Sequence, residues 1–234
     1  MEPLVVEILP LTRAPSSDAG LVLIEGATSL IADPEAVRRH LLTCASYAKK
    51  YTVCLLSGLF LLEDALCLCL FGPDGLPIDR QVALCEPMPL QGRTQPGQET
   101  TILDTPFGRV FLCVDEDIRD QRVLRTAALK GAGLVLSVRM IDVAEDTVEE
   151  LYQTAWNTAQ TQNLYVISHS AAGCSVCCPA PLTRAQDGFL VRRETNIGRF
   201  ILNFDRLDEV RQQLPLLDAL NTEVFLHHQN ELGR

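Results

Sequence analysis

The sequence is short of positive charge. It has 20 lysines and arginines against 30 aspartates and glutamates, which gives a formal net charge of −10 at pH 7. Its lysines are Lys49, Lys50 and Lys130, and no run or patch of basic residues is visible. Nucleic acids and anionic membranes attract proteins through such patches, so we expect neither as a partner.

Long apolar runs are also missing. No apolar stretch reaches the roughly 18 residues of a transmembrane helix. Residues 1–10 carry no positively charged start of a signal peptide. The nine cysteines therefore suggest free thiols in a reducing compartment. We expect a cytoplasmic protein.

Motifs that hold nucleotides or metals are absent as well. There is no Walker loop, no G-x-G-x-x-G and no Ser-His-Asp order. Cys174, Cys177 and Cys178 lack a second ligand pair, and in a strand Cys177 faces away from the other two, so buried free thiols are favoured over zinc. His227 and His228 fall in a polar tail. We predict no cofactor and no metal.

The chain is long enough, and apolar enough, to bury a full core. It has 234 residues, of which 47% are hydrophobic, and no shift in composition divides it. We therefore expect one α/β domain over residues 1–234.

The segment from Thr105 to Leu136 carries the clearest pattern. Val110–Val114 is a short apolar run typical of a strand buried on both faces. Acidic residues 115–117 interrupt it, apolar residues then recur at helical spacing, and Lys130-Gly131 ends that helix. A further strand begins at Leu134. The acids therefore lie at the carboxyl end of a strand, where open α/β sheets bind ligands.

The remaining elements follow from apolar runs and turn residues. We expect no helix between the first two strands, which the usual parallel crossover would contain. Residues 52–57 and 65–71 are expected to form a hairpin, and residues 188–193 and 199–203 a final strand pair. The other expected strands are 4–9, 21–24 and 164–169, and the expected helices are 35–50 and 145–162.

At these residues the sequence resembles a family. The TPFGR turn, the apolar strand, the acidic residue and arginine of the next turn, and ALKGA look like the core of the nitrilase, or carbon–nitrogen hydrolase, superfamily. The resemblance spans about residues 4–225 and implies a four-layer αββα sandwich. It also implies pairing of protomers into a homodimer through the helices.

The family uses a cysteine nucleophile, a glutamate base and a lysine that stabilises the tetrahedral intermediate. Its spacing places the nucleophile at Asp115, since using Cys113 would require a compensated deletion and insertion. Glu25, at the end of LVLIEG, matches the base, and Gln81 in IDRQVAL stands at the lysine position. We expect these three positions to meet at one pocket.

Other positions complete the expected site. The resemblance assigns Glu116 and Arg119, in the turn after the strand, to binding. It also assigns Ser168, where the family often has asparagine.

Two hypotheses follow. The first is a catalytically degenerate, non-catalytic protein that binds a small molecule or a protein, or serves as a scaffold. The second is a hydrolase of carbon–nitrogen bonds with altered chemistry, in which Glu25 and Asp115 work as paired carboxylates or hold a divalent cation with Glu116 or Asp117. The structural alternative for Glu116 and Asp117 is that they are residues at the start of a helix whose negative charges interact favourably with the helix dipole.

Overall fold

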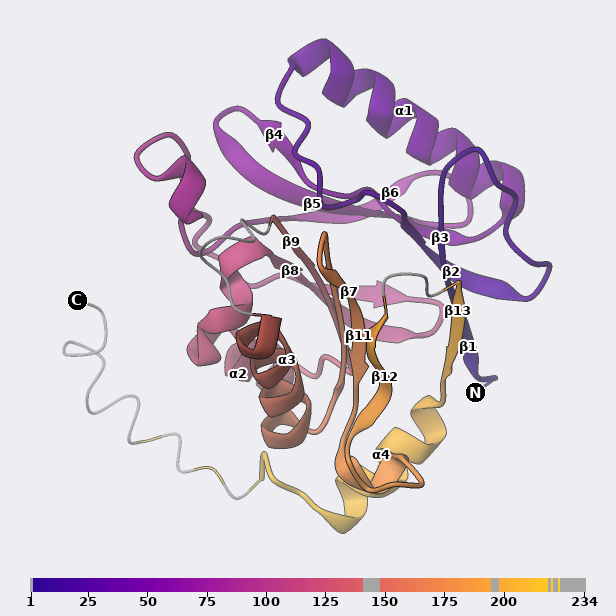
Figure 1. Cartoon of the computed structure of the whole chain (residues 1–234), viewed down its shortest axis with the longest axis vertical. Helices are drawn as coiled ribbons and strands as arrows, with labels where there is room; N and C mark the ends of the chain where they lie inside the picture. Colours follow the sequence, from indigo (N-terminus) through magenta and orange to yellow (C-terminus); the bar gives the residue numbers. More distant parts are fainter. Residues whose placement is uncertain (1, 141–147, 195–197, 219, 221–222, 224–234) are drawn as a thin grey trace.

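The protein is a sandwich of two β-sheets with helices on both outer faces. The computed structural model describes residues 2–140, 148–194, 198–218, 220 and 223 (Figure 1). Helix α1 (Pro34–Tyr51) covers the outer face of the first sheet, and α2 (Gln121–Leu129) and α3 (Val148–Gln162) cover the outer face of the second. The architecture is the αββα sandwich that the sequence predicts.

The first sheet has seven strands. Its order is β13-β1-β2-β3-β5-β4, and β6 also pairs with β5. Strands β1, β2 and β3 are parallel, whereas the other pairs are antiparallel. The bounds are β1 Leu4–Leu9, β2 Ala19–Ile24, β3 Cys54–Leu56, β4 Phe60–Leu62, β5 Ala65–Phe71, β6 Pro77–Val82 and β13 Arg199–Leu202.

The second sheet has six strands in the order β12-β11-β10-β9-β8-β7. Strands β8, β9 and β10 are parallel, so their carboxyl ends meet at one edge of the sheet. The bounds are β7 Ile102–Thr105, β8 Gly108–Val114, β9 Leu134–Arg139, β10 Tyr165–Ser170, β11 Gly173–Cys177 and β12 Phe189–Glu194.

Polar residues fix the starts of three helices. The side chains of Asp33, Asp120 and Asn203 each accept a hydrogen bond from a backbone N–H of the first turn, as N-cap residues do. The helices are α1 Pro34–Tyr51, α2 Gln121–Leu129, α3 Val148–Gln162 and α4 Phe204–Gln213, with 3-10 turns η1 Met88–Leu90, η2 Asp115–Arg119 and η3 Ala180–Leu182. Each helix within the described ranges is too short or too polar to span a membrane.

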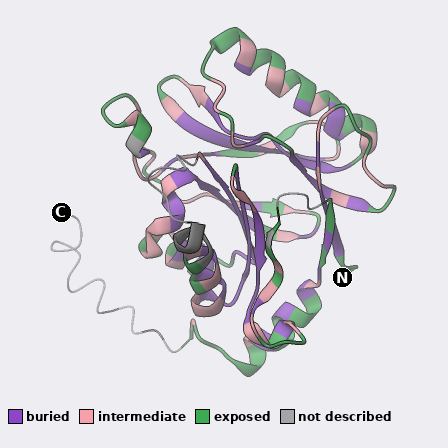
Figure 2. Ribbon diagram, viewed as in Figure 1, coloured by how far each residue is buried: buried purple, intermediate pink, exposed green. Residues whose placement is uncertain are grey.

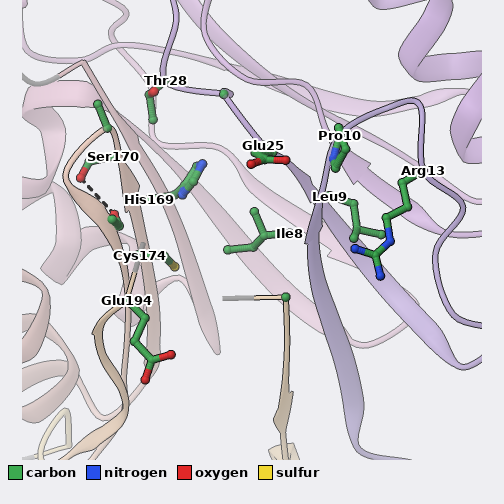
Figure 3. A pocket seen from close by; sticks show the side chains of 14 residues that line it. Ile8, Leu9, Pro10, Arg13, Glu25, Thr28, His169, Ser170, Cys174 and Glu194 are labelled. Carbon is green, nitrogen blue, oxygen red and sulfur yellow. Dashed lines mark hydrogen bonds between the residues drawn. The ribbon is translucent and has the colours of Figure 1, made fainter. Parts of the chain in front are cut away.

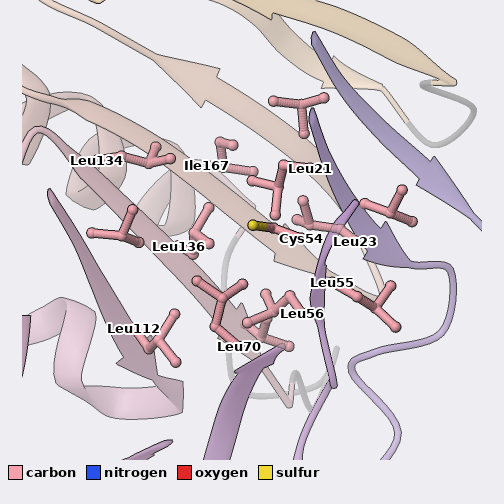
Figure 4. Packing of buried hydrophobic residues seen from close by; sticks show 14 of the residues in the cluster. Leu21, Leu23, Cys54, Leu55, Leu56, Leu70, Leu112, Leu134, Leu136 and Ile167 are labelled. Carbon is pink, nitrogen blue, oxygen red and sulfur yellow. The ribbon is translucent and has the colours of Figure 1, made fainter. Parts of the chain in front are cut away.

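Leucines fill the space between the sheets. Full burial of one such side chain contributes roughly 1.5–3 kcal/mol. Figure 2 shows that burial follows the two sheets and the helix faces turned toward them. Residues of both sheets meet in Figure 4, among them Leu23, Leu56 and Leu70 of the first sheet and Leu112, Leu134, Leu136 and Ile167 of the second.

Several expected elements differ from the structure. The expected final pair is wrong, because β12 pairs with β11 in one sheet and β13 pairs with β1 in the other. Each of the two strands pairs with the backbone N–H and C=O groups at the edge of a different sheet. The hairpin of β3 and β5 forms, but residues 60–62 add the unexpected strand β4 to β5. The expected helix start at Glu145 lies outside the described residues.

The connection from β1 to β2 has no helix, as expected, and folds back onto its neighbours instead. Glu7 is buried and its carboxylate accepts hydrogen bonds from the backbone N–H of Ser16, at 3.0 Å, and from the Ser16 hydroxyl. Arg199 lies 3.6 Å from the same carboxylate. From α1, the Tyr47 hydroxyl donates to the Arg13 carbonyl at 2.7 Å. The loop of residues 10–18 is thus anchored to β1 and α1.

Candidate functional site

Asp115 forms an elbow between strand β8 and helix η2. Its φ of +49° lies in the left-handed region, which non-glycine residues occupy rarely and aspartate more readily than most. A strained turn from strand to helix is how α/β-hydrolases present a nucleophile. Here the side chain is fully buried, and its Oδ1 accepts a hydrogen bond from the Met140 N–H at 2.7 Å.

Asp117, two residues further on, connects the elbow to the segment after β6. Its carboxylate accepts backbone hydrogen bonds from Leu84 at 2.8 Å, Cys85 at 2.7 Å and Val114 at 3.3 Å. Burial raises the pKa of this carboxyl to about 7, and the backbone donors oppose that rise. The sequence offered Asp117 as a helix-start residue or as a ligand of a divalent cation, so this structural role was missed.

Glu116 pairs with two arginines. Its Oε2 lies 3.0 Å from Nε of Arg119, and its Oε1 lies 3.6 Å from Nη2 of Arg139. The Arg139 side chain is almost fully buried, at 1% exposure. Glu116 and Arg119, which were expected to bind a ligand, are therefore joined in an ion pair. Arg139 was missed, although an arginine that ends the apolar run LVLSVR was a visible signal.

Gln81 is buried on β6 with its amide turned toward the chain before β7. Its Oε1 accepts the Thr101 N–H at 2.9 Å. Its Nε2 donates to the carbonyls of Val82 at 2.7 Å and Glu99 at 3.0 Å. Both amide hydrogens and one lone pair are thus used by the backbone.

Glu25 lies at a cavity of about 430 Å³ between the ends of β1, β2, β10 and β11 (Figure 3). It is exposed, and its N–H donates to the Leu9 carbonyl at 2.9 Å. Of the three expected catalytic positions this cavity is lined by Glu25 and not by Gln81 or Asp115. Other lining residues are Ile8, Arg13, Thr28, His169, Ser170 and Glu194.

His169 is the buried titratable residue of this cavity. Its side chain is 9% exposed, and burial lowers the pKa of the imidazole, against the opposing effect of the Ile24 carbonyl. Ser168, the expected binding residue, is its neighbour on β10 and points to the other face of the sheet. The cavity is therefore lined by His169 and not by Ser168.

The cysteine thiols are largely buried and have raised pKa values, whereas a nucleophilic cysteine has a lowered pKa. All nine cysteines are free, and eight of them are buried. Desolvation raises the pKa of every one, to about 12 for Cys85 and Cys174 and well above the ordinary value for Cys113. Cys174 and Cys178 belong to the core between the sheets and Cys177 to the cluster under the helices, as strand alternation predicts. Among the described residues no three His, Cys, Asp or Glu side chains form a metal-binding group.

Comparisons with known proteins agree on the fold. No family model and no curated protein matches the sequence. A Saccharomyces cerevisiae member of branch 10 of the nitrilase superfamily aligns with a TM-score of 0.71 at 16% identity, over 92% of this chain and 95% of that one. A carbon–nitrogen hydrolase from Helicobacter pylori gives 0.74 at 17%, over 99% and 98%. An amidase from Nesterenkonia gives 0.66 at 14%, over 90% and 94%. The chain has the nitrilase-superfamily fold.

Proposed function

We propose that this protein does not hydrolyse carbon–nitrogen bonds and instead binds a small molecule in the cavity beside Glu25 and His169. The observation that carries the proposal is the state of the thiols. Amide and nitrile hydrolysis on this fold needs a thiolate, which forms where neighbouring charges lower a cysteine's pKa. Here burial raises the pKa of all nine thiols.

The residue at the elbow does not replace the thiolate. A carboxylate that attacks an amide must form a high-energy anhydride. The Asp115 carboxylate is also buried and already accepts the Met140 N–H. Its position supports a structural role in place of a catalytic one.

Stabilisation of the intermediate is weakened at the same time. An oxyanion needs donors aimed at it, and a cation is the strongest of them. Gln81 is neutral, and both of its amide hydrogens are directed at the Val82 and Glu99 carbonyls. Lys130 lies at the C-terminal end of α2, and its ammonium group donates a hydrogen bond to the Thr100 carbonyl.

The cavity supports binding. Its volume falls within the usual range for small-molecule sites, about 300–1,000 Å³. Apolar Ile8 and Leu9 line it together with a small number of charged and hydroxyl side chains. This mixture of apolar, charged and hydroxyl side chains can hold and orient a small molecule.

Ammonia release from simple amides, nitriles and carbamoyl compounds tests the proposal. We expect none from the wild-type protein. Turnover abolished by Asp115→Asn or Glu25→Gln would overturn the proposal and favour the paired-carboxylate hydrolase. Turnover that survives both changes would indicate a contaminating enzyme. A second purification should then remove the activity.

A further inference from the structure

The cavity beside Glu25 is rich in hydrogen-bond acceptors. Among the residues that the structure describes, the charged lining residues are Glu25, Glu194 and Arg13, so two negative charges and one positive charge give this set a net charge of −1. Burial lowers the pKa of the His169 imidazole, which favours its neutral form. The Ser170 hydroxyl donates to the Gly173 carbonyl at 3.1 Å, which leaves the lone pairs of its oxygen free to accept.

Two of these acceptors lie close together on opposite sheets. His169 is the last residue but one of β10, and its two buried ring nitrogens have no hydrogen-bond partner in the part of the chain that the structure describes. In a neutral imidazole one of these nitrogens carries a hydrogen and the other is an acceptor. Figure 3 shows the His169 ring and the Glu25 carboxylate turned toward the same space. In that view the Arg13 guanidinium lies beyond Leu9, away from this pair.

We infer that the cavity binds its ligand through a primary ammonium group, with Glu25 as the counter-ion and His169 as a second acceptor. This inference rests on the proposed binding function. An ammonium group has three N–H donors and no acceptor, which complements a carboxylate and a neutral imidazole. The net charge of −10 attracts such a cation from solution and repels an anion. The apolar floor at Ile8 suits an alkyl chain attached to the nitrogen.

Three probes of one length and different charge test this inference. Pentylammonium is the cation, pentanamide is neutral and pentanoate is the anion. Each is titrated calorimetrically into the wild-type protein, into Glu25→Gln and into the control Glu209→Gln. Glu209 is an exposed carboxylate on α4 outside the cavity, so its change alters the net charge by the same amount.

We expect pentylammonium to bind most tightly. Glu25→Gln should weaken its binding by roughly tenfold or more, because a charge-assisted hydrogen bond is lost. Glu209→Gln should leave the affinity unchanged within a factor of about two. A melting curve without probe establishes that each variant is folded, which is expected because Glu25 is exposed.

The other outcomes overturn the inference. Pentanoate or pentanamide binding more tightly than pentylammonium would contradict it and leave the proposed binding function intact. Pentylammonium binding that is absent, or insensitive to Glu25→Gln, would also contradict it. Release of ammonia from pentanamide that is lost in Asp115→Asn would instead overturn the proposed function itself.

Discussion

Asp115 accepts a hydrogen bond from the backbone N–H of Met140 at 2.7 Å, which joins the elbow after β8 to the end of β9. The position that the sequence assigns to a nucleophile is therefore part of the framework that holds two parallel strands together. A fully buried acceptor in this role contributes to stability.

Two substitutions separate this structural role from the charge. Asparagine keeps an acceptor for the Met140 N–H and tolerates the left-handed backbone, whereas alanine does neither. We expect Asp115→Ala to lower the free energy of unfolding by about 1–3 kcal/mol more than Asp115→Asn does. Urea unfolding of the three proteins measures this difference. Equal loss in the two variants would contradict the structural role.

Asp117 should make stability depend on pH. Burial raises the pKa of its carboxyl from 3.8 to about 7 in the folded chain. Between these two values the folded chain holds a proton that the unfolded chain releases, so the free energy of unfolding falls as the pH rises through this window. The contribution is complete below about pH 4 and is lost above about pH 7, with a limiting slope of ~1.4 kcal/mol per pH unit.

Denaturant unfolding of the wild-type protein and of Asp117→Asn, at pH 5 and pH 8, measures that contribution. The variant cannot titrate at this position, so the wild-type protein should lose more stability than the variant between pH 5 and pH 8. Parallel curves, or a wild-type protein that gains on the variant as the pH rises, would refute the assignment.

Glu7 should hold the loop of residues 10–18 in place. Glu7→Ala removes the acceptor of the Ser16 N–H and hydroxyl, and we expect a loss on the order of 1–3 kcal/mol together with faster hydrogen exchange in the loop. Asp18→Ala is the matched control, because Asp18 also pairs with Arg199 but is exposed. Little change is expected there. Unaltered exchange in Glu7→Ala would mean that the loop is anchored by other contacts.

We also predict a homodimer. Large apolar side chains remain exposed on the protein, among them Leu129, Leu190, Leu214 and Leu216. Association would remove this surface from water. Light scattering at micromolar concentration should give twice the chain mass of 25.8 kDa. A clean monomer mass would contradict the prediction.

The parts of the fold that could be predicted are those with a strong local signal. The strand β8, the helix α2 and the stop after it follow from an apolar run, helical spacing and Gly131, whose φ of +90° suits glycine. Strand β4 has only residues 60–62, too few for a periodic pattern. The partners of β12 and β13 depend on which sheet edge lies near, and sequence spacing does not report that.

The predictions for the site also succeed where the local signal is strong and fail where it is weak. The strand end before Asp115 was predicted correctly, because β8 ends at Val114. His169, which lines the cavity, was not predicted, because the resemblance pointed to its neighbour Ser168, whose side chain lies on the other face of the sheet. The role of Gln81 could not be predicted, since its partners Glu99 and Thr101 lie about twenty residues away in an irregular segment.

By the family resemblance, Asp115 stands at the nucleophile position and Gln81 at the position of the stabilising lysine. One absent electrostatic donor already costs on the order of 10²–10³ in rate. Restoring either group alone should therefore leave the protein inactive. A lysine at position 81 can still donate to the Val82 and Glu99 carbonyls, although Thr101 loses its acceptor, so the variant should fold with reduced stability.

The most direct measurement is ammonia release from amides, nitriles and carbamoyl compounds by four proteins side by side, namely wild type, Asp115→Cys, Gln81→Lys and the double variant. We predict no turnover by the first three and any activity first in the double variant, which alone regains a thiol, a cation and the Glu25 base. Wild-type turnover that Asp115→Asn or Glu25→Gln abolishes would contradict the account.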